Sequence, residues 1–184
     1  MVIDKRNMSE EQMIKGCLEN NPIAQKTLYN KLGPKMMGVC LRYMTNEEEA
    51  QDVLQDGFVK VFDKLGAYSG AGSFEGWVRR IFVNTALDAI RKNKKLKHQA
   101  QIDDVAFALK SSDFIFEKLV AEDLMKLLQR LPLGYKTVFN LYAIEGYSHK
   151  EIAKKMNVTV STSKSQFSRA KAMLRQKITE LEKE

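Results

Sequence analysis

Apolar residues recur at helical spacing along almost the whole chain, and few residues interrupt the pattern. Three prolines and ten glycines among 184 residues favour long helices over a strand-rich fold. In the first half, the pattern predicts helices that begin after Ser9, at Pro22, after Pro34, and after either Thr45 or Asn46. The last of these helices is expected to continue to residue 65. This half therefore indicates a small helical bundle.

A glycine-rich loop, residues 66–73, follows, and Ser73 is well suited to cap the next helix, from Phe74 to about Lys92. The glycines are similar to a dinucleotide-binding fingerprint, but that motif needs a preceding strand and a different spacing. On the helix, a core face is expected of Phe74, Val78, Ile81, Phe82, Thr85 and Ala89. A neighbouring stripe carries Trp77, Arg80, Asn84 and Arg91, a mixture that suits single-stranded DNA because bases stack on aromatic rings and phosphates pair with arginine.

The periodicity weakens between residues 98 and 118, which predicts a linker between domains. Beyond it, amphipathic segments at 119–131 and 136–144 are expected to form short helices. The predicted fold class is all-α, with two small helical domains joined by a flexible linker. We expect the first domain to span 8–97 and the second 119–184.

The clearest signal comes near the end of the chain. Ser148 and Glu151 have the spacing of a capping box at the start of a short helix. Asn157 stands at the turn, where a left-handed backbone is needed, and a second helix is expected from about Val160 to Lys183. The two helices are expected to approach closely at Ala153 and to share a core formed by Ile152, Met156 and Val158. This spacing is typical of a DNA-binding helix-turn-helix.

The second helix of this motif has two faces. One is apolar and carries Phe167, Ala170, Leu174 and Ile178. The other carries the candidate contacts to duplex DNA, which are Thr162, Lys164, Ser165, Gln166, Ser168 and Arg169. Short hydroxyl side chains allow close approach to a groove, and Arg, Lys and Gln can contact base edges or phosphates.

The net charge of +7 is concentrated in two blocks. Residues 71–100 carry seven basic groups against two acidic ones, and residues 148–184 carry nine against four. The intervening and preceding segments are close to neutral or acidic. Two basic blocks indicate two contacts with a polyanion, although charge alone is equally compatible with solubility.

Other classes of function find little support. Cys17 and Cys40 are isolated, which fits a reducing compartment, and His98 and His149 have no ligand or base partner at useful spacing. No metal site, cofactor or catalytic residue is therefore expected. No signal segment or membrane span is found, so we expect a cytoplasmic protein with no membrane insertion of its own.

Together, the runs LP (131–132), VFNLY (138–142), EGYS (145–148), EIA (151–153) and SRA (168–170) resemble region four of the extracytoplasmic-function sigma factors of bacteria. The resemblance implies that the helix from Val160 enters the major groove of the −35 promoter element. Three positions depart from the usual pattern, because Ser161, Ser163 and Gln166 stand where Gly, Val and Arg are common. These departures affect which promoter sequence is expected to be recognised, and not the expected role of the helix in binding DNA.

The run EAQDVLQDGF (49–58) is similar to region two of the same family. It implies that Asp52, Gln55 and Asp56 bind the clamp coiled coil of the large subunit of core RNA polymerase. A second run, GSFEGWVRRIFVNTALD (72–88), matches the part of region two that captures a flipped base of the −10 element. Carried over to this chain, the −10 contacts are Tyr68, Ser73, Phe74, Trp77, Arg80, Asn84 and Arg91. Trp77 is equally compatible with a plain core position.

The resemblance covers residues 8–97 and 119–178, with no segment like the region-one or region-three domains of larger sigma factors. It implies a non-enzymatic subunit that carries RNA polymerase to promoters and promotes DNA melting. It also implies masking by an anti-sigma factor, which the length of the linker would permit. The alternative is a helix-turn-helix regulator that binds duplex DNA by itself. Dependence on core polymerase distinguishes the two.

Overall fold

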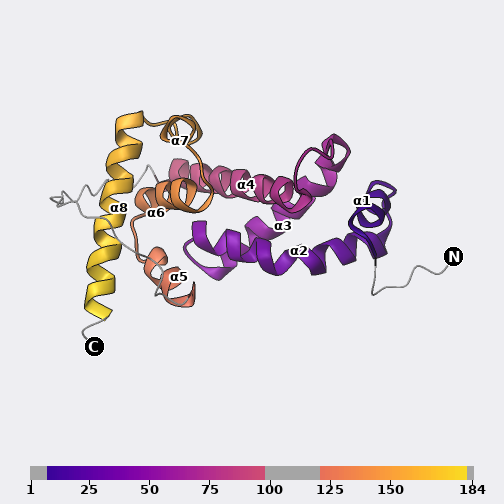
Figure 1. The fold of residues 1–184 in the computed structure, drawn as a ribbon, viewed down its shortest axis with the longest axis horizontal. Helices are drawn as coiled ribbons and strands as arrows, with labels where there is room; N and C mark the ends of the chain where they lie inside the picture. The colour runs from indigo at the N-terminus through magenta and orange to yellow at the C-terminus, as the bar shows by residue number, and fades with distance from the viewer. Residues whose placement is uncertain (1–7, 98–120, 182–184) are drawn as a thin grey trace. The chain divides into compact units, whose positions relative to one another are not determined.

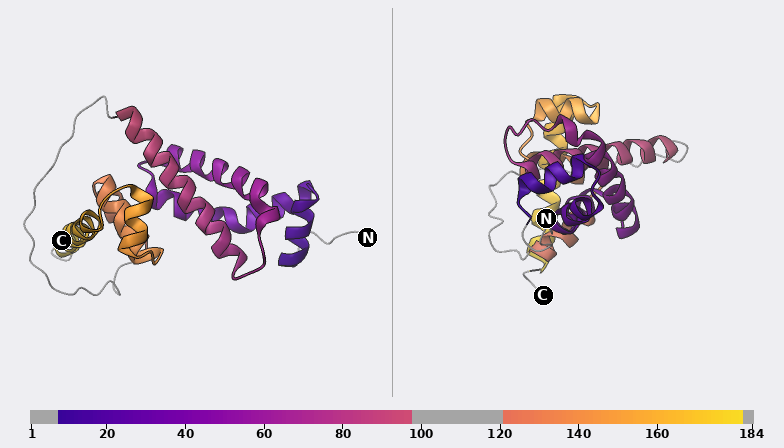
Figure 2. Two further views of the ribbon diagram at one scale, coloured as in Figure 1. Left: turned by 90° about the horizontal axis from the view of Figure 1, so that it is seen from above. Right: turned by 90° about the vertical axis from the view of Figure 1, so that its right-hand side faces the viewer.

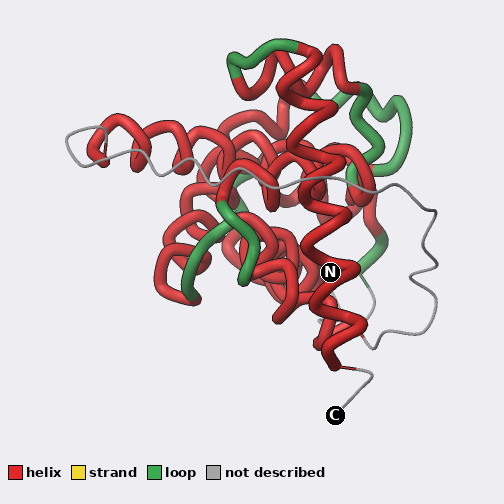
Figure 3. The backbone as a smooth tube through the Cα atoms, turned by 90° about the vertical axis from the view of Figure 1, so that its left-hand side faces the viewer, coloured by secondary structure: helices red, strands yellow, loops and turns green. Residues whose placement is uncertain are grey.

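The computed structural model describes residues 8–97 and 121–181, and the predicted linker lies outside this part of the chain. The chain forms two compact units, Met1–Lys92 and Asn93–Glu184. Within the described residues all regular structure is helical, as the red segments of Figure 3 show. The all-α prediction is therefore confirmed.

The first unit contains four α-helices and one short 3₁₀ turn in its described part (Figure 1): α1 (Glu10–Leu18), α2 (Pro22–Tyr43), α3 (Glu47–Lys64), the 3₁₀ turn η1 (Leu65–Ala67) and α4 (Phe74–Lys97). Two of the predicted helix N-caps are confirmed, those of α1 and α3. The Ser9 hydroxyl accepts a hydrogen bond from the Gln12 amide, and the Asn46 side chain, not that of Thr45, accepts one from the Glu49 amide. Each cap satisfies an amide that a helix start leaves without an intrahelical partner.

The expected break at Pro34 is wrong, because α2 continues through this residue as one helix. Proline removes one backbone hydrogen bond and normally kinks or ends a helix. Here Leu32 and Gly33 just before it, and Met36 just after it, are all buried. Packing of both halves of the helix on the same core therefore outweighs the local cost.

Helix α4 crosses α3 at a close point, and Figure 2 shows α2, α3 and α4 side by side. Gly57 of α3 lies directly against the ring of Phe82 of α4. The neighbouring Phe58 packs edge-on to the same ring, with 5.2 Å between centroids, and its centroid lies 4.6 Å from that of Tyr29 on α2. These rings lock the three helices together. Helix α4 continues to Lys97, beyond the expected end near Lys92, since its basic tail contains good helix formers and no Gly or Pro.

The second unit is built on its longest helix, α8 (Val160–Leu181), drawn in yellow in Figure 1. Its other described elements are α5 (Ala121–Gln129), α6 (Leu133–Phe139), the π-helical turn η2 (Asn140–Ile144) and α7 (His149–Met156). The core contains Leu127, Leu128, Leu131, Phe139, Ala170, Leu174 and Ile178. The last three are members of the predicted apolar stripe on α8. That prediction is confirmed.

Helix α6 differs from the expectation at both ends. It begins at Leu133 rather than near Lys136, since Pro132 occupies the position before its first turn. At its other end the backbone widens into η2, where the Glu145 amide donates to the Asn140 carbonyl at 2.9 Å. Such a π turn inserts one extra residue into a helix, a feature with no signature in hydrophobic spacing.

Candidate nucleic-acid interface

The helix-turn-helix is formed by α7, the turn at 157–159 and the start of α8. Ser148 and Glu151 make the predicted capping box, and the Ser148 amide donates to the Glu151 carboxylate at 2.8 Å. Asn157 adopts the predicted left-handed conformation, with φ 53° and ψ 50°. The next amide, that of Val158, donates to the Ala153 carbonyl at 3.0 Å. The turn is thus closed by a backbone bond to the end of α7, which fixes the direction in which α8 leaves it.

A polar contact joins the two helices of this motif. The Oγ of Ser163, which is fully buried, lies 2.9 Å from Nδ1 of His149. The imidazole also stacks on Tyr142, with 4.3 Å between ring centroids. Its pKa is lowered, first by burial and then by the positive charge of Lys164, so the ring is neutral at pH 7.

No partner was expected for His149 from the sequence, so its contact with Ser163 was not predicted. A signal was present, because Ser163 lies one helical turn before Phe167 on the same apolar stripe of α8. A hydroxyl at a core-facing position needs a hydrogen-bond partner.

The predicted contact residues to duplex DNA are spread over the start of α8. Lys164 and Ser165 are exposed, whereas Thr162, Ser168 and Arg169 are half-buried. The Thr162 hydroxyl lies 2.8 Å from that of Thr159. The Arg169 guanidinium donates to the Tyr135 hydroxyl at 3.4 Å, a long bond from α8 to α6. By helical spacing Thr162, Ser165, Ser168 and Arg169 share one side of α8, and Lys164 lies beside them.

The side chain of Gln166 lies against a neighbouring helix of the same unit. Its side-chain amide faces Gly134 of α6, where an added Cβ would come within 3.2 Å of its Nε2. Its Oε1 is buried and finds no hydrogen-bond partner within the described residues. In this structure its amide packs between α8 and α6, and the contact of Gln166 with DNA stays a prediction.

In the first unit, the loop at 66–73 is closed by its own side chains. The Tyr68 hydroxyl donates to the Gly72 carbonyl at 2.9 Å, across two glycines in left-handed conformations, Gly70 and Gly72. At the end of the loop the Ser73 hydroxyl accepts from the Gly76 amide at 3.3 Å, which supports its predicted role as a cap. The loop is therefore held to the first turn of α4.

An aromatic cluster supports this loop. Tyr68 lies against Phe74 and Trp77, with centroids 5.2 and 5.4 Å apart. Phe74 is 1% exposed, so its ring supports the loop from within the core, and its contact with the −10 strand stays a prediction. Trp77 and Tyr68 are half-buried, so each ring offers an exposed part beside the loop.

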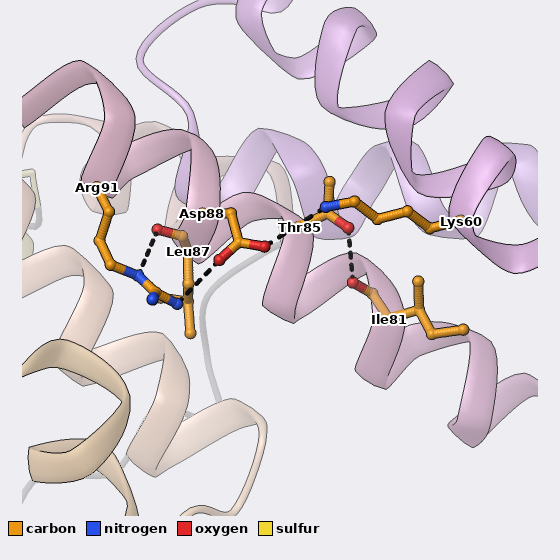
Figure 4. A network of polar contacts seen from close by, with 6 residues as sticks. All are labelled: Lys60, Ile81, Thr85, Leu87, Asp88 and Arg91. Carbon is orange, nitrogen blue, oxygen red and sulfur yellow. Dashed lines mark hydrogen bonds and ion pairs between the residues drawn. The ribbon is translucent and has the colours of Figure 1, made fainter. Parts of the chain in front are cut away.

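The polar stripe of α4 lies on the exposed side of the helix. Arg80, Asn84 and Arg91 are all exposed. Figure 4 shows that Arg91 already has partners, because its guanidinium bonds to the Leu87 carbonyl at 3.3 Å and pairs with Asp88 at 3.0 Å. Asp88 also pairs with Lys60 of α3 at 3.4 Å. Both ion pairs are largely exposed and hence weak, so a phosphate could compete for Arg91.

The acidic candidates lie on the opposite side of α3 from its buried face. Asp52, Gln55 and Asp56 are all exposed, and their spacing of three and four residues places them on one side of the helix. None of these three side chains is buried. The geometry provides an acidic surface that a basic partner helix could contact.

Two protein-family models match the chain. The model for sigma-70 region 2 matches residues 28–96, and the model for sigma-70 region 4 matches residues 121–174. The Haemophilus influenzae ECF RNA polymerase sigma-E factor is 25% identical over 185 residues, covering 95% of this chain and 97% of the relative. The chain belongs to the extracytoplasmic-function sigma factors of the sigma-70 family. As a sigma factor it serves promoter-specific transcription initiation by RNA polymerase, and it is a subunit without catalytic activity.

Other relatives agree with this assignment. The Pseudomonas aeruginosa RNA polymerase sigma-H factor is 27% identical, with 88% of this chain and 90% of the relative covered. Among solved structures, the sigma factor RpoE of Bartonella quintana, in complex with the anti-sigma factor NepR, has a similar fold. Its TM-score is 0.52 at 20% identity, covering 84% of this sigma factor and 96% of RpoE.

These matches leave no support for the alternative of a regulator that works without polymerase, because both helical units match sigma-70 regions. The helix-turn-helix of the sigma factor lies within the region 4 match, and the aromatic loop within the region 2 match. No helix in the described ranges is both long and apolar enough to cross a membrane.

Proposed function

We propose that the two helical units of this sigma factor divide promoter recognition between them. Residues 8–97 form the region 2 domain, which contacts core polymerase and the −10 element. Residues 119–184 form the region 4 domain, which contacts the −35 duplex, and residues 98–118 link the two. The proposal is supported by two different features in separate units, an aromatic loop beside exposed polar residues of α4 in the region 2 match and a helix-turn-helix in the region 4 match.

The single-strand surface is the loop at 66–73 with the start of α4. The half-buried rings of Tyr68 and Trp77 offer stacking faces, and Arg80 and Asn84 lie further along the same helix. Stacking of one base on an aromatic ring contributes about 1–3 kcal/mol, comparable to the cost of unstacking it from a duplex. A loop already closed by the bond from Tyr68 to Gly72 loses little entropy when it binds a base. Ser73 and Arg91 complete this proposed −10 surface.

The duplex surface is the exposed side of α8. Lys164 and Arg169 supply positive charge, and the hydroxyls of Thr162, Ser165 and Ser168 lie near them. Short side chains leave room for the helix to lie deep in a major groove, and the bond from Arg169 to Tyr135 holds one guanidinium in place. We assign −35 recognition to these five residues.

Core polymerase is proposed to dock on α3 through Asp52, Gln55 and Asp56. Acidic groups on an exposed helix face attract a basic coiled coil and accelerate its encounter. We also propose that the sigma factor acts in the bacterial cytoplasm, because promoter DNA and core polymerase are there. Masking by an anti-sigma factor is a further part of the proposal, supported by the Bartonella complex with NepR.

Run-off transcription tests the proposal as a whole. Purified core polymerase is incubated with a pool of genomic promoter fragments, with and without the sigma factor. New defined transcripts that appear only with the sigma factor are expected, and their start sites would reveal the −10 and −35 sequences. Absence of transcripts, together with tight binding to duplex DNA without polymerase, would contradict it.

Variants test the polymerase-docking surface and the −10 surface separately. Asp56→Lys is expected to prevent co-elution with core polymerase, whereas Glu47→Lys, in the first turn of the same helix but on another side, should leave it unchanged. Arg80→Ala should lower open-complex formation on duplex promoters more than on templates already melted at −10. Equal losses on both templates would argue against a role for Arg80 in holding the strand.

A further inference from the structure

One apolar side chain stands at the start of the helix that we assign to the −35 duplex. Val160 is the first residue of α8, and 38% of its surface is exposed. In the described part of the second unit, the other exposed large hydrophobic residues are Leu133 and Tyr142, which belong to α6 and η2. Val160 alone of these three lies on the proposed DNA-binding helix.

The backbone around Val160 is held from both sides. On one side the Val158 amide is bonded to the Ala153 carbonyl at 3.0 Å. On the other, the Thr159 hydroxyl accepts from the Thr162 amide at 3.0 Å, and the Ser163 amide donates to the Thr159 carbonyl at 3.0 Å. The side chain has limited freedom as well, because the two heavy atoms on Cβ restrict χ1 of a valine. Val160 therefore presents a fixed apolar surface to solvent.

Its polar neighbours have less freedom to contact bases. The Thr162 hydroxyl is paired with Thr159, Ser163 is buried against His149, and the Ser165 hydroxyl donates to the Thr162 carbonyl at 3.0 Å. Exposed beside Val160 are Ser161 and, one turn further on the same side, Lys164. The first turn thus combines a rigid isopropyl group with a cation that can hold a phosphate.

Helix-turn-helix proteins place the N-terminal residues of the second helix over base edges in the major groove. The distinctive apolar feature of that groove is the C5-methyl group of thymine. We propose that Val160 contacts the methyl group of one thymine in the −35 element and so selects for it. This inference rests on the proposed binding of α8 to the −35 duplex.

The test replaces thymine by deoxyuridine, which removes only the methyl group and keeps base pairing. Holoenzyme is assembled from core polymerase and the full chain, and its affinity is measured on promoter DNA carrying deoxyuridine at each −35 thymine in turn. At one position the substitution should weaken wild-type binding by about three- to fivefold, the effect of one buried methyl group. With Val160→Ala the same substitution should have no effect.

Leu133→Ala is the matched control, because Leu133 is also an exposed apolar residue at the first position of a helix in the same unit. It should keep the wild-type sensitivity to deoxyuridine. Wild-type holoenzyme that binds the promoter but ignores every deoxyuridine would overturn the role of Val160 and leave −35 binding intact. The same holds if Val160→Ala keeps full sensitivity. Holoenzyme that shows no dependence on the −35 sequence would overturn both the inference and the proposed function.

Discussion

The Nδ1 of His149 and the Oγ of Ser163 lie 2.9 Å apart and join the two helices of the helix-turn-helix. Valine, which the family resemblance leads one to expect at the position of Ser163, has no group that could make this hydrogen bond. Here the contact is directional, because a hydrogen bond requires both side chains in one geometry. The pair therefore fixes how α8 is oriented on α7, and so where the residues of its exposed side are presented.

Removing the hydroxyl should weaken the second unit. Ser163→Ala leaves a half-buried imidazole nitrogen without its partner, and we expect a loss of about 1 kcal/mol in opening free energy for this unit. Hydrogen exchange of the α7 and α8 amides measures it directly, since it reports local opening even in a two-unit protein. Ser165→Ala, at an exposed serine two residues further along α8, should change exchange little. Equal effects of the two substitutions would contradict the importance of the pair.

Acid should destabilise the same unit through His149. The lowered pKa means that the unfolded chain binds a proton at this residue before the folded chain does. Above the ordinary histidine pKa of about 6.5 both states are neutral, and as the pH falls below it the folded state loses stability. Between pH 7 and pH 5, the α8 amides of the wild type should therefore lose more protection than those of His149→Gln. Parallel losses in the two proteins would show that His149 is not responsible.

Features that depend on a few neighbouring residues could be predicted from the sequence. The Ser148 capping box and the left-handed Asn157 follow from local backbone chemistry, and both were found as expected. The same is true of the apolar stripe on α8, since periodicity alone defines it. The family resemblance added the acidic face of α3, whose three candidates are indeed exposed on one side.

Features that depend on distant packing could not be predicted. The continuous helix through Pro34 requires knowledge of the core on both sides of the proline. Gln166 was placed near the DNA face by its spacing, but its amide lies against Gly134 of α6, where no side chain blocks it. Phe74 belongs to a motif that binds DNA in the family, yet burial gives it a supporting role. In each case tertiary contacts outweigh the local signal.

The close approach of α3 and α4 predicts opposite effects at two glycines. A Cβ at Gly57 would overlap the ring of Phe82, so Gly57→Ala should destabilise the first unit by about 1–3 kcal/mol through overpacking. At Gly38, within α2, a Cβ meets nothing within 4 Å, so Gly38→Ala should stabilise by about 0.5–1 kcal/mol. The single tryptophan, Trp77, lies in this unit, so its fluorescence during urea unfolding reports both changes. A stable Gly57→Ala protein would mean that the helices separate easily.

The bond from Tyr68 to Gly72 gives the sharpest test of the −10 loop. Tyr68→Phe keeps the ring against Phe74 and Trp77 but removes the hydroxyl that closes the loop. Because the loop must then become ordered when it binds a base, we expect open-complex formation to be about three- to tenfold slower. Loss of the hydrogen bond should also lower the free energy of unfolding of the first unit by about 1 kcal/mol. Fluorescence of 2-aminopurine in the −10 element measures the opening.

Ser69→Ala is the control for this change, since its side chain makes only a long bond, 3.4 Å, from the Ala71 amide within the same loop. It should open promoters at nearly the wild-type rate. A template already melted at −10 should restore the Tyr68→Phe protein only in part, because the loop must still order around the unpaired base. Full activity of Tyr68→Phe on duplex templates would show that the aromatic cluster, without the hydrogen bond, is enough to hold the loop.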